Sequence, residues 1–118
     1  MSRHVVIGAG PVGRAIVDAL TSRGIEAQVL SRSGTQIPGA QATVVDALDT
    51  ERLAPVIAGA DVVYQASSPE YHRYREDFPP LQRSIASAVQ KNDAVLVVIE
   101  NLYGYGPVQK PMTEDMPL

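Results

Sequence analysis

The residues best suited to chemistry form a glycine-rich run near the start of the chain, Gly8-Ala9-Gly10-Pro11-Val12-Gly13. The run follows the short apolar stretch 4–7 and opens a segment whose apolar residues recur at helical spacing. A G-x-G-x-x-G pattern between a strand and a helix predicts a site for the pyrophosphate of a dinucleotide. A tight strand–helix turn without a ligand is the alternative interpretation.

Each position of the run has an expected role. Gly8 lets the chain turn sharply off the strand, Gly10 lets bare backbone approach the pyrophosphate, and Gly13 lets the helix pack close to the strand. Pro11 suits the helix start because its missing N–H removes no intrahelical bond, and Val12 is the first apolar residue of the helix. The free amides and the positive end of the helix dipole then face the anion. We therefore expect these five residues to bind a cofactor.

The composition limits the classes of function. A chain of 118 residues is expected to form one dinucleotide-binding domain over 1–118. The net charge of −3 and the pI near 5.2 disfavour a nucleic-acid or membrane partner. Without cysteine there is no disulfide, thiolate zinc site or thiol nucleophile, which fits a cytoplasmic protein. His4 and His72 are solitary and have no metal-ligand spacing, so we expect no metal site.

Strands and helices alternate along the chain. We expect strands at 4–7, 27–31, 42–45, 62–66 and 94–100, and helices at 11–22, 51–58 and 79–91. We expect Thr50 to cap the second helix and Pro55 to kink or shorten it. This alternation predicts an α/β fold, a Rossmann-type doubly wound parallel sheet of order 3-2-1-4-5 with helices on both faces.

Three segments carry further expectations. The unbroken aliphatic run 94–99 predicts a strand buried on both faces. Residues 67–77 are expected to form a surface loop, with a mobile rim over the ligand site, or base stacking by Tyr71, Tyr74 and Phe78, as alternatives. Residues 101–118 are expected to be a loop leading towards a missing C-terminal part.

The residues after the second strand indicate which dinucleotide binds. An acidic residue there accepts hydrogen bonds from the adenosine ribose hydroxyls and repels a 2′-phosphate. This chain has Ser31-Arg32-Ser33 instead, and a guanidinium flanked by two hydroxyls favours a phosphate. NADP is therefore the first choice of cofactor and NAD the second. A solvated turn arginine is the alternative for Arg32.

Several stretches together resemble a known family. They are 6–13, 46–49 (Asp-Ala-Leu-Asp), 59–66 (Gly-Ala-Asp-Val-Val-Tyr-Gln-Ala), 102–107 and 113–117. The chain resembles the N-terminal part of the NAD-dependent epimerase/dehydratase family, within the extended short-chain dehydrogenases/reductases. The resemblance covers nearly all of the chain.

The resemblance implies roles for further residues. Asp46 would accept a hydrogen bond from the adenine amino group, with Ala47 or Leu48 near the ring. Ala66 and Ser67 would line the cofactor, and Asn101 stands where the family has a substrate-binding Ser or Thr. The alternatives are a turn aspartate at Asp46, an ordinary strand end at Ala66 and Ser67, and a local turn at Asn101.

The family's proton-exchanging Tyr-x-x-x-Lys pair is absent from this sequence. An unassisted phenol, with a pKa near 10, is a poor base at neutral pH. We therefore expect an incomplete, cofactor-binding segment of an enzyme that transfers hydride between nicotinamide and a small, sugar-like carbonyl or alcohol. The alternative is a stand-alone NAD(P)-sensing regulatory domain. An exposed edge on the fifth strand predicts self-association.

Overall fold

The central element is a five-stranded parallel sheet. The computed structural model describes residues 2–99 and 113–115. The strands are β1 (His4–Ile7), β2 (Ala27–Ser31), β3 (Ala40–Val44), β4 (Val62–Gln65) and β5 (Val95–Val98). Their order is β3-β2-β1-β4-β5, as predicted, and every pair is parallel. The order reverses between β1 and β4, which places the expected crevice at their carboxyl ends.

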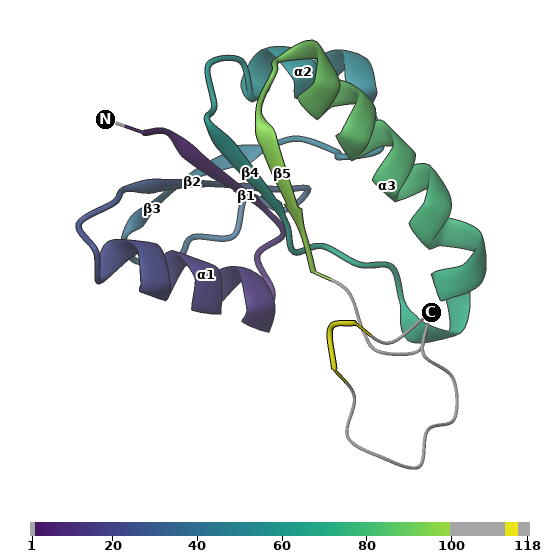
Figure 1. The fold of residues 1–118 in the computed structure, drawn as a ribbon, viewed down its shortest axis with the longest axis horizontal. Coiled ribbons are helices and arrows are strands. Elements are labelled where there is room, and N and C mark those ends of the chain that lie inside the picture. Colours follow the sequence, from purple (N-terminus) through teal and green to yellow (C-terminus); the bar gives the residue numbers. More distant parts are fainter. Residues whose placement is uncertain (1, 100–112, 116–118) are drawn as a thin grey trace.

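Helices cover both faces of the sheet (Figure 1). Helix α1 (Pro11–Thr21) packs on one face, where Val6 and Val29 meet Val17 and Leu20 in one apolar cluster. Helices α2 (Thr50–Val56) and α3 (Tyr74–Lys91) lie on the other face. The doubly wound architecture is therefore confirmed.

The second apolar cluster lies beneath α2 and α3. It joins inward residues of the strands to the apolar sides of the two helices, and its largest buried members are Leu30, Leu53, Ile57 and Ile85. Because the cluster draws on four strands and two helices, it fixes α3 against the sheet.

The prediction of a loop over 67–77 holds for residues 67–70 and is wrong from residue 71 onwards. A 3-10 turn at Tyr71–Arg73 leads directly into α3, so Pro79 and Pro80 lie inside that helix and do not open it. Each proline leaves one backbone carbonyl of the preceding turn, at Arg75 and Glu76, without an intrahelical donor. Both residues are exposed, so water can hydrate the two carbonyls.

Smaller differences between the predicted and the observed structure concern the ends of β3 and α2. Strand β3 begins two residues earlier than predicted, directly after the left-handed Gly39 (φ +87°). Helix α2 is capped by Asp49, whose carboxylate accepts from the Arg52 amide, and not by Thr50. The helix ends one residue after Pro55, which agrees with the expected shortening.

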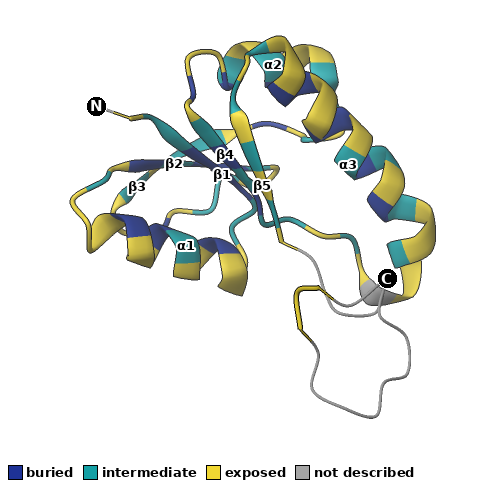
Figure 2. Ribbon diagram, in the orientation of Figure 1, coloured by how far each residue is buried: buried dark blue, intermediate teal, exposed yellow. Residues whose placement is uncertain are grey.

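Strand β5 is not buried on both faces, contrary to the prediction. Val95 is 62% exposed, Val97 36% and Ile99 41%, whereas Leu96 and Val98 are only partly exposed (Figure 2). By register Val97 lies beside Tyr64, on the α1 side of the sheet. Helix α1 packs against β1 and β2, so this side of β5 remains open.

Candidate functional site

The turn between β1 and α1, residues 8–13, is called the glycine turn below. At two of its three glycine positions a larger residue would clash with the backbone. Gly8 has φ +117°, and a Cβ there would lie 2.6 Å from the Ser67 amide nitrogen. A Cβ on Gly13 would lie 2.0 Å from the Gly8 carbonyl oxygen. A Cβ on Gly10 would meet nothing within 4 Å. Packing within the protein therefore demands Gly8 and Gly13 but leaves Gly10 open to an approaching group.

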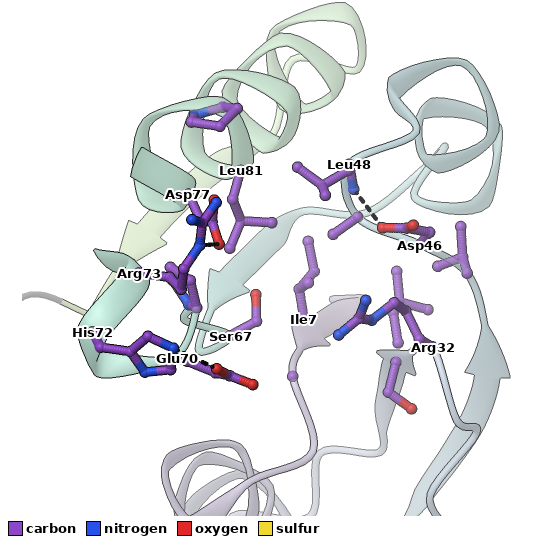
Figure 3. A pocket seen from close by; sticks show the side chains of 17 residues that line it. Ile7, Arg32, Asp46, Leu48, Ser67, Glu70, His72, Arg73, Asp77 and Leu81 are labelled. Atoms are coloured by element: carbon purple, nitrogen blue, oxygen red, sulfur yellow. Dashed lines mark hydrogen bonds and ion pairs between the residues drawn. The ribbon is translucent and has the colours of Figure 1, made fainter. Parts of the chain in front are cut away.

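A cavity of about 600 Å³ opens beside this turn, at the carboxyl ends of the strands (Figure 3). Its apolar lining includes Ile7, Leu30 and Leu81, and its polar lining includes serine, arginine and carboxylate side chains from four segments. The cavity lies at the reversal of strand order, where open α/β sheets bind their ligands.

Arg32 supplies a positive charge at the end of β2. It is exposed, lines the cavity, and has no hydrogen bond or ion pair with any described residue. The Ser31 hydroxyl accepts from the amides of Gly34 (2.9 Å) and Thr35 (3.3 Å), which fixes the turn that carries Arg32. The guanidinium is therefore held near the cavity and remains available to an anion.

Asp46 lies at the end of β3 and supports a local turn. One carboxylate oxygen accepts from the Leu48 amide at 2.9 Å, and the second oxygen remains an acceptor on the cavity lining. Leu48 is 53% exposed and also lines the cavity. An acceptor beside an exposed leucine suits a flat heterocycle with an amino group.

Ser67 lies on the opposite side, after β4. The residue lines the cavity, whereas its hydroxyl oxygen is buried and has no hydrogen-bond partner among the described residues. Buried polar atoms without a partner are uncommon in folded proteins, which makes this atom a candidate for ligand contact.

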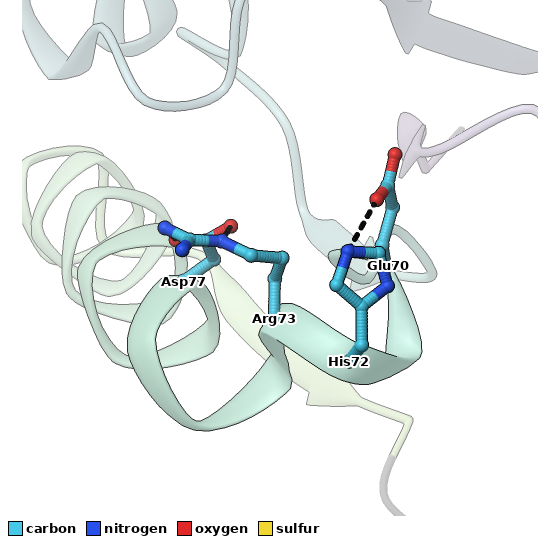
Figure 4. A network of polar contacts seen from close by, with 4 residues as sticks. All are labelled: Glu70, His72, Arg73 and Asp77. Atoms are coloured by element: carbon cyan, nitrogen blue, oxygen red, sulfur yellow. Dashed lines mark hydrogen bonds and ion pairs between the residues drawn. The ribbon is translucent and has the colours of Figure 1, made fainter.

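The start of α3 and the turn before it form a second wall of the cavity, in a segment predicted as a surface loop with a rim over the ligand site as the alternative (Figure 4). Arg73 donates from Nε and Nη2 to the Asp77 carboxylate, at 3.2 and 3.1 Å, and His72 lies 3.2 Å from Glu70. The hydrogen bond to Asp77, and then its charge, raise the pKa of Arg73 above its ordinary value. All four side chains line the cavity.

A sequence signal for this wall exists. Tyr74, Phe78, Leu81, Ile85 and Ala88 follow one another at spacings of four and three, which is the helical period, and the proline pair masks it. Tyr74 and Phe78 stack with ring centroids 4.6 Å apart, which fixes the first turn of α3.

The structure gathers half of the predicted binding residues around the cavity. Gly8, Ser31, Arg32, Asp46, Ala47 and Ser67 line it, whereas Gly10, Pro11, Val12, Gly13, Ser33 and Ala66 do not. Residues 10–13 form the adjoining start of α1. The Ser33 hydroxyl forms a hydrogen bond with the Thr35 hydroxyl, and Ala66 packs on the α1 side of the sheet. Asn101 lies outside the described residues.

Among residues 2–99 and 113–115, no metal-ligating cluster gathers and no helix is long and apolar enough to cross a bilayer.

Comparison with known protein families gives a match over residues 8–116 to a family described as NAD(P)H-binding. The chain belongs to this NAD(P)H-binding family. No match was found among curated proteins.

This NAD(P)H-binding chain is also similar in fold to solved structures. UDP-glucose 4-epimerase from Brucella ovis, in complex with NAD, has a TM-score of 0.87 at 18% identity, over 99% of this chain and 41% of that one. UDP-N-acetylglucosamine 4-epimerase from Bacillus cereus has a TM-score of 0.79 at 19% identity, over 100% and 42%. WbmG from Bordetella bronchiseptica, in complex with NAD and UDP, has a TM-score of 0.74 at 17% identity, over 98% and 43%.

The chain thus spans less than half the length of these three structures. The predicted resemblance to the epimerase/dehydratase fold is confirmed, as is the incompleteness of this chain's fold relative to those structures.

Proposed function

We propose that this chain binds NADP in preference to NAD, as the cofactor-binding part of an epimerase or oxidoreductase of the cytoplasm. The observation that carries the proposal is the convergence of the glycine turn, Arg32, Asp46 and Ser67 on one cavity at the reversal of strand order. The family match supports NAD(P) as the ligand class.

The described residues fit such a cofactor. The open space at Gly10 admits the pyrophosphate against bare backbone at the start of α1. Arg32 pairs with the adenosine 2′-phosphate, and Asp46 accepts from the adenine amino group beside Leu48. Ser67 supplies a hydroxyl for the part of the cofactor beyond the pyrophosphate.

When bound, the nicotinamide would supply hydride chemistry towards a carbonyl or alcohol. The substrate we propose is a small molecule of the nucleotide-sugar type, as named for the similar epimerases. The chain contributes binding and orientation of the cofactor. The proton-exchanging Tyr-x-x-x-Lys pair, absent from these 118 residues, would come from a further part of the protein.

Titration calorimetry of NADP and NAD against the wild type and Arg32→Ala tests the proposal. We expect the wild type to bind NADP more tightly, and the variant to lose about tenfold or more in NADP affinity while NAD affinity stays unchanged. The physical reason is that only NADP carries the phosphate with which the guanidinium pairs.

Arg23→Ala is the matched control. Arg23 follows the carboxyl end of α1, is exposed, and lies outside the cavity lining. Loss of the Arg23 side chain should leave the affinities for NADP and NAD unchanged. Equal affinity of the wild type for NAD and NADP would remove the NADP assignment, and binding of neither would remove the proposed function.

A further inference from the structure

Ser84 is a polar residue among the buried residues of α3, which are otherwise apolar. In the part of the chain that the structure describes, only Gln65 and Ser84 are both polar and buried. The Gln65 amide has no hydrogen-bond partner there, whereas the Ser84 hydroxyl has two, and both partners lie outside α3. A serine hydroxyl within a helix commonly bonds the backbone of its own helix, so these partners need a physical explanation.

The two hydrogen bonds of Ser84 run in one direction. Its Oγ donates to the Ala47 carbonyl oxygen at 2.5 Å and lies 2.8 Å from the Thr50 hydroxyl. A hydroxyl has a single hydrogen, so Thr50 donates to Ser84 while Ser84 donates to Ala47. In such a series each bond polarises and strengthens the next. Thr50, the first residue of α2, therefore orients the Ser84 hydroxyl towards the Ala47 carbonyl.

These bonds join two walls of the cavity. Ala47 belongs to the turn 46–49, which also places Asp46 on the cavity lining. Ser84 lies one helical turn after Leu81, which lines the cavity from α3. Ser84 itself is outside the lining. The distance between the turn and α3 therefore depends on a hydrogen bond made just behind the cavity surface.

A second connection between α2 and α3 lies at the other end of α3. Asn92 Nδ2 donates to the carbonyl oxygens of Ala54 in α2 and Ala88 in α3, both at 2.9 Å. None of these three residues lines the cavity. The two helices are thus also joined at a place remote from the cavity, and Asn92 offers a matched comparison for Ser84.

The position of the turn 46–49 matters for the base of the proposed dinucleotide, and this step rests on the proposed function. One oxygen of Asp46 already accepts from the Leu48 amide, which leaves the other for the adenine amino group. Such a hydrogen bond needs a donor–acceptor distance of about 2.7–3.2 Å, so a displacement of the turn by about 1 Å breaks it. A residue that holds the turn can therefore control base selectivity without touching the base.

We propose that Ser84 is a positioning residue for base recognition. Its hydrogen bond to Ala47 holds the turn 46–49 at a fixed distance from α3 and keeps the Asp46 carboxylate in reach of the adenine amino group. Thr50 supports this role by fixing the direction of the Ser84 hydroxyl.

Calorimetry with NADP and its hypoxanthine analogue, in which a carbonyl replaces the adenine amino group, measures this selectivity. In the wild type we expect NADP to bind about tenfold more tightly, because the analogue presents an acceptor to the Asp46 carboxylate. In Ser84→Ala the ratio should fall to about twofold, since the turn is no longer held. Thr50→Val removes the orienting hydroxyl and should also lower the ratio, whereas Thr50→Ser keeps the hydroxyl and the wild-type ratio.

Asn92→Ala is the matched control. It removes the other connection between α2 and α3, so its melting temperature should fall while the tenfold ratio remains. An equal fall of the ratio in Asn92→Ala would assign the effect to general loss of stability and overturn the inference. A wild-type ratio in Ser84→Ala would also overturn it.

The remaining outcomes separate this inference from the proposed function. If Ser84→Ala does not fold, the pair Thr50→Val and Thr50→Ser decides, and equal ratios in the two variants would overturn the inference. A wild type that binds NADP and the analogue equally would overturn it as well, because Asp46 would then recognise no amino group. A wild type that binds neither ligand would overturn the dinucleotide proposal itself.

Discussion

Gly10 and Gly13 belong to one motif but differ in what surrounds them. Gly13 is buried against the backbone of Gly8, whereas Gly10 is exposed and has open space where a Cβ would stand. Gly13 is therefore required by packing within the free protein, whereas Gly10 leaves the room that the proposed cofactor would use. The G-x-G-x-x-G pattern alone does not reveal this difference between the two glycines.

Gly13→Ala and Gly10→Ala should consequently give opposite results. We expect Gly13→Ala to lower the free energy of unfolding by about 3 kcal/mol or more, since its methyl group cannot coexist with the Gly8 carbonyl oxygen. Gly10→Ala should cost about 0.5 kcal/mol as a poorer helix cap, yet weaken NADP binding at least tenfold. Urea denaturation and calorimetry measure the two quantities. A Gly10→Ala variant with full affinity would show that no ligand backbone contact forms there.

At the scale of elements, the start of α3 decides how complete the cavity is. The apolar side of the helix runs from Phe78 to Val89, but its first turn also supplies Asp77 to the cavity, next to the preceding Arg73. A helix that began at Pro79 would leave both of these polar residues in a loop. The continuous helix instead holds the Arg73–Asp77 pair one turn apart, in reach of each other.

Pro79→Ala tests whether α3 is continuous. An alanine amide at this position can donate to the Arg75 carbonyl, so we expect the free energy of unfolding to rise by about 1 kcal/mol or more, measured by circular dichroism during thermal unfolding. Pro38→Ala is the control, since Pro38 is exposed and lies outside helices and strands. A loss of stability on Pro79→Ala would mean that α3 begins at the proline pair.

The sheet could be predicted from the sequence because its signals are local. Runs of four or five residues rich in aliphatic side chains, each followed by turn residues or a glycine, define the strands, and alternation with helices fixes the parallel order. Exposure could not be predicted in the same way. The sequence of the run 94–99 predicts a strand buried on both faces. Whether a helix covers the α1 side of β5 depends on segments distant in the sequence, and in this structure Val95 is exposed.

For the site, the sequence predicts the groups that follow the strands, whereas it offers the groups before and at the start of α3 only as the rim that is the alternative to a surface loop. Arg32 follows β2 directly and Asp46 comes two residues after β3, so topology brings them together. His72 and Arg73 precede a proline pair that hides the helical period, so they read as part of a surface loop. The unpaired amide of Gln65 has no sequence signal, because burial and missing partners are properties of the packed molecule.

At the scale of the whole molecule, we expect self-association through β5. Among the described residues the strand pairs only with β4, and its exposed side chains Val95, Val97 and Ile99 carry no charge that would repel a second copy. An unprotected apolar edge strand is a template for pairing with another chain. Sedimentation velocity over increasing concentration should show dimers or larger species.

Val97→Lys should shift this equilibrium towards monomer, because a charge on the open side of the strand opposes burial against a second copy. Val44→Lys adds the same charge to β3, at the other edge of the sheet, and should leave the association at β5 intact. A wild type that remains monomeric at every concentration would refute the prediction. Equal loss of association in both variants would assign the effect to net charge and not to the β5 edge, since each substitution moves the chain from −3 to about −2.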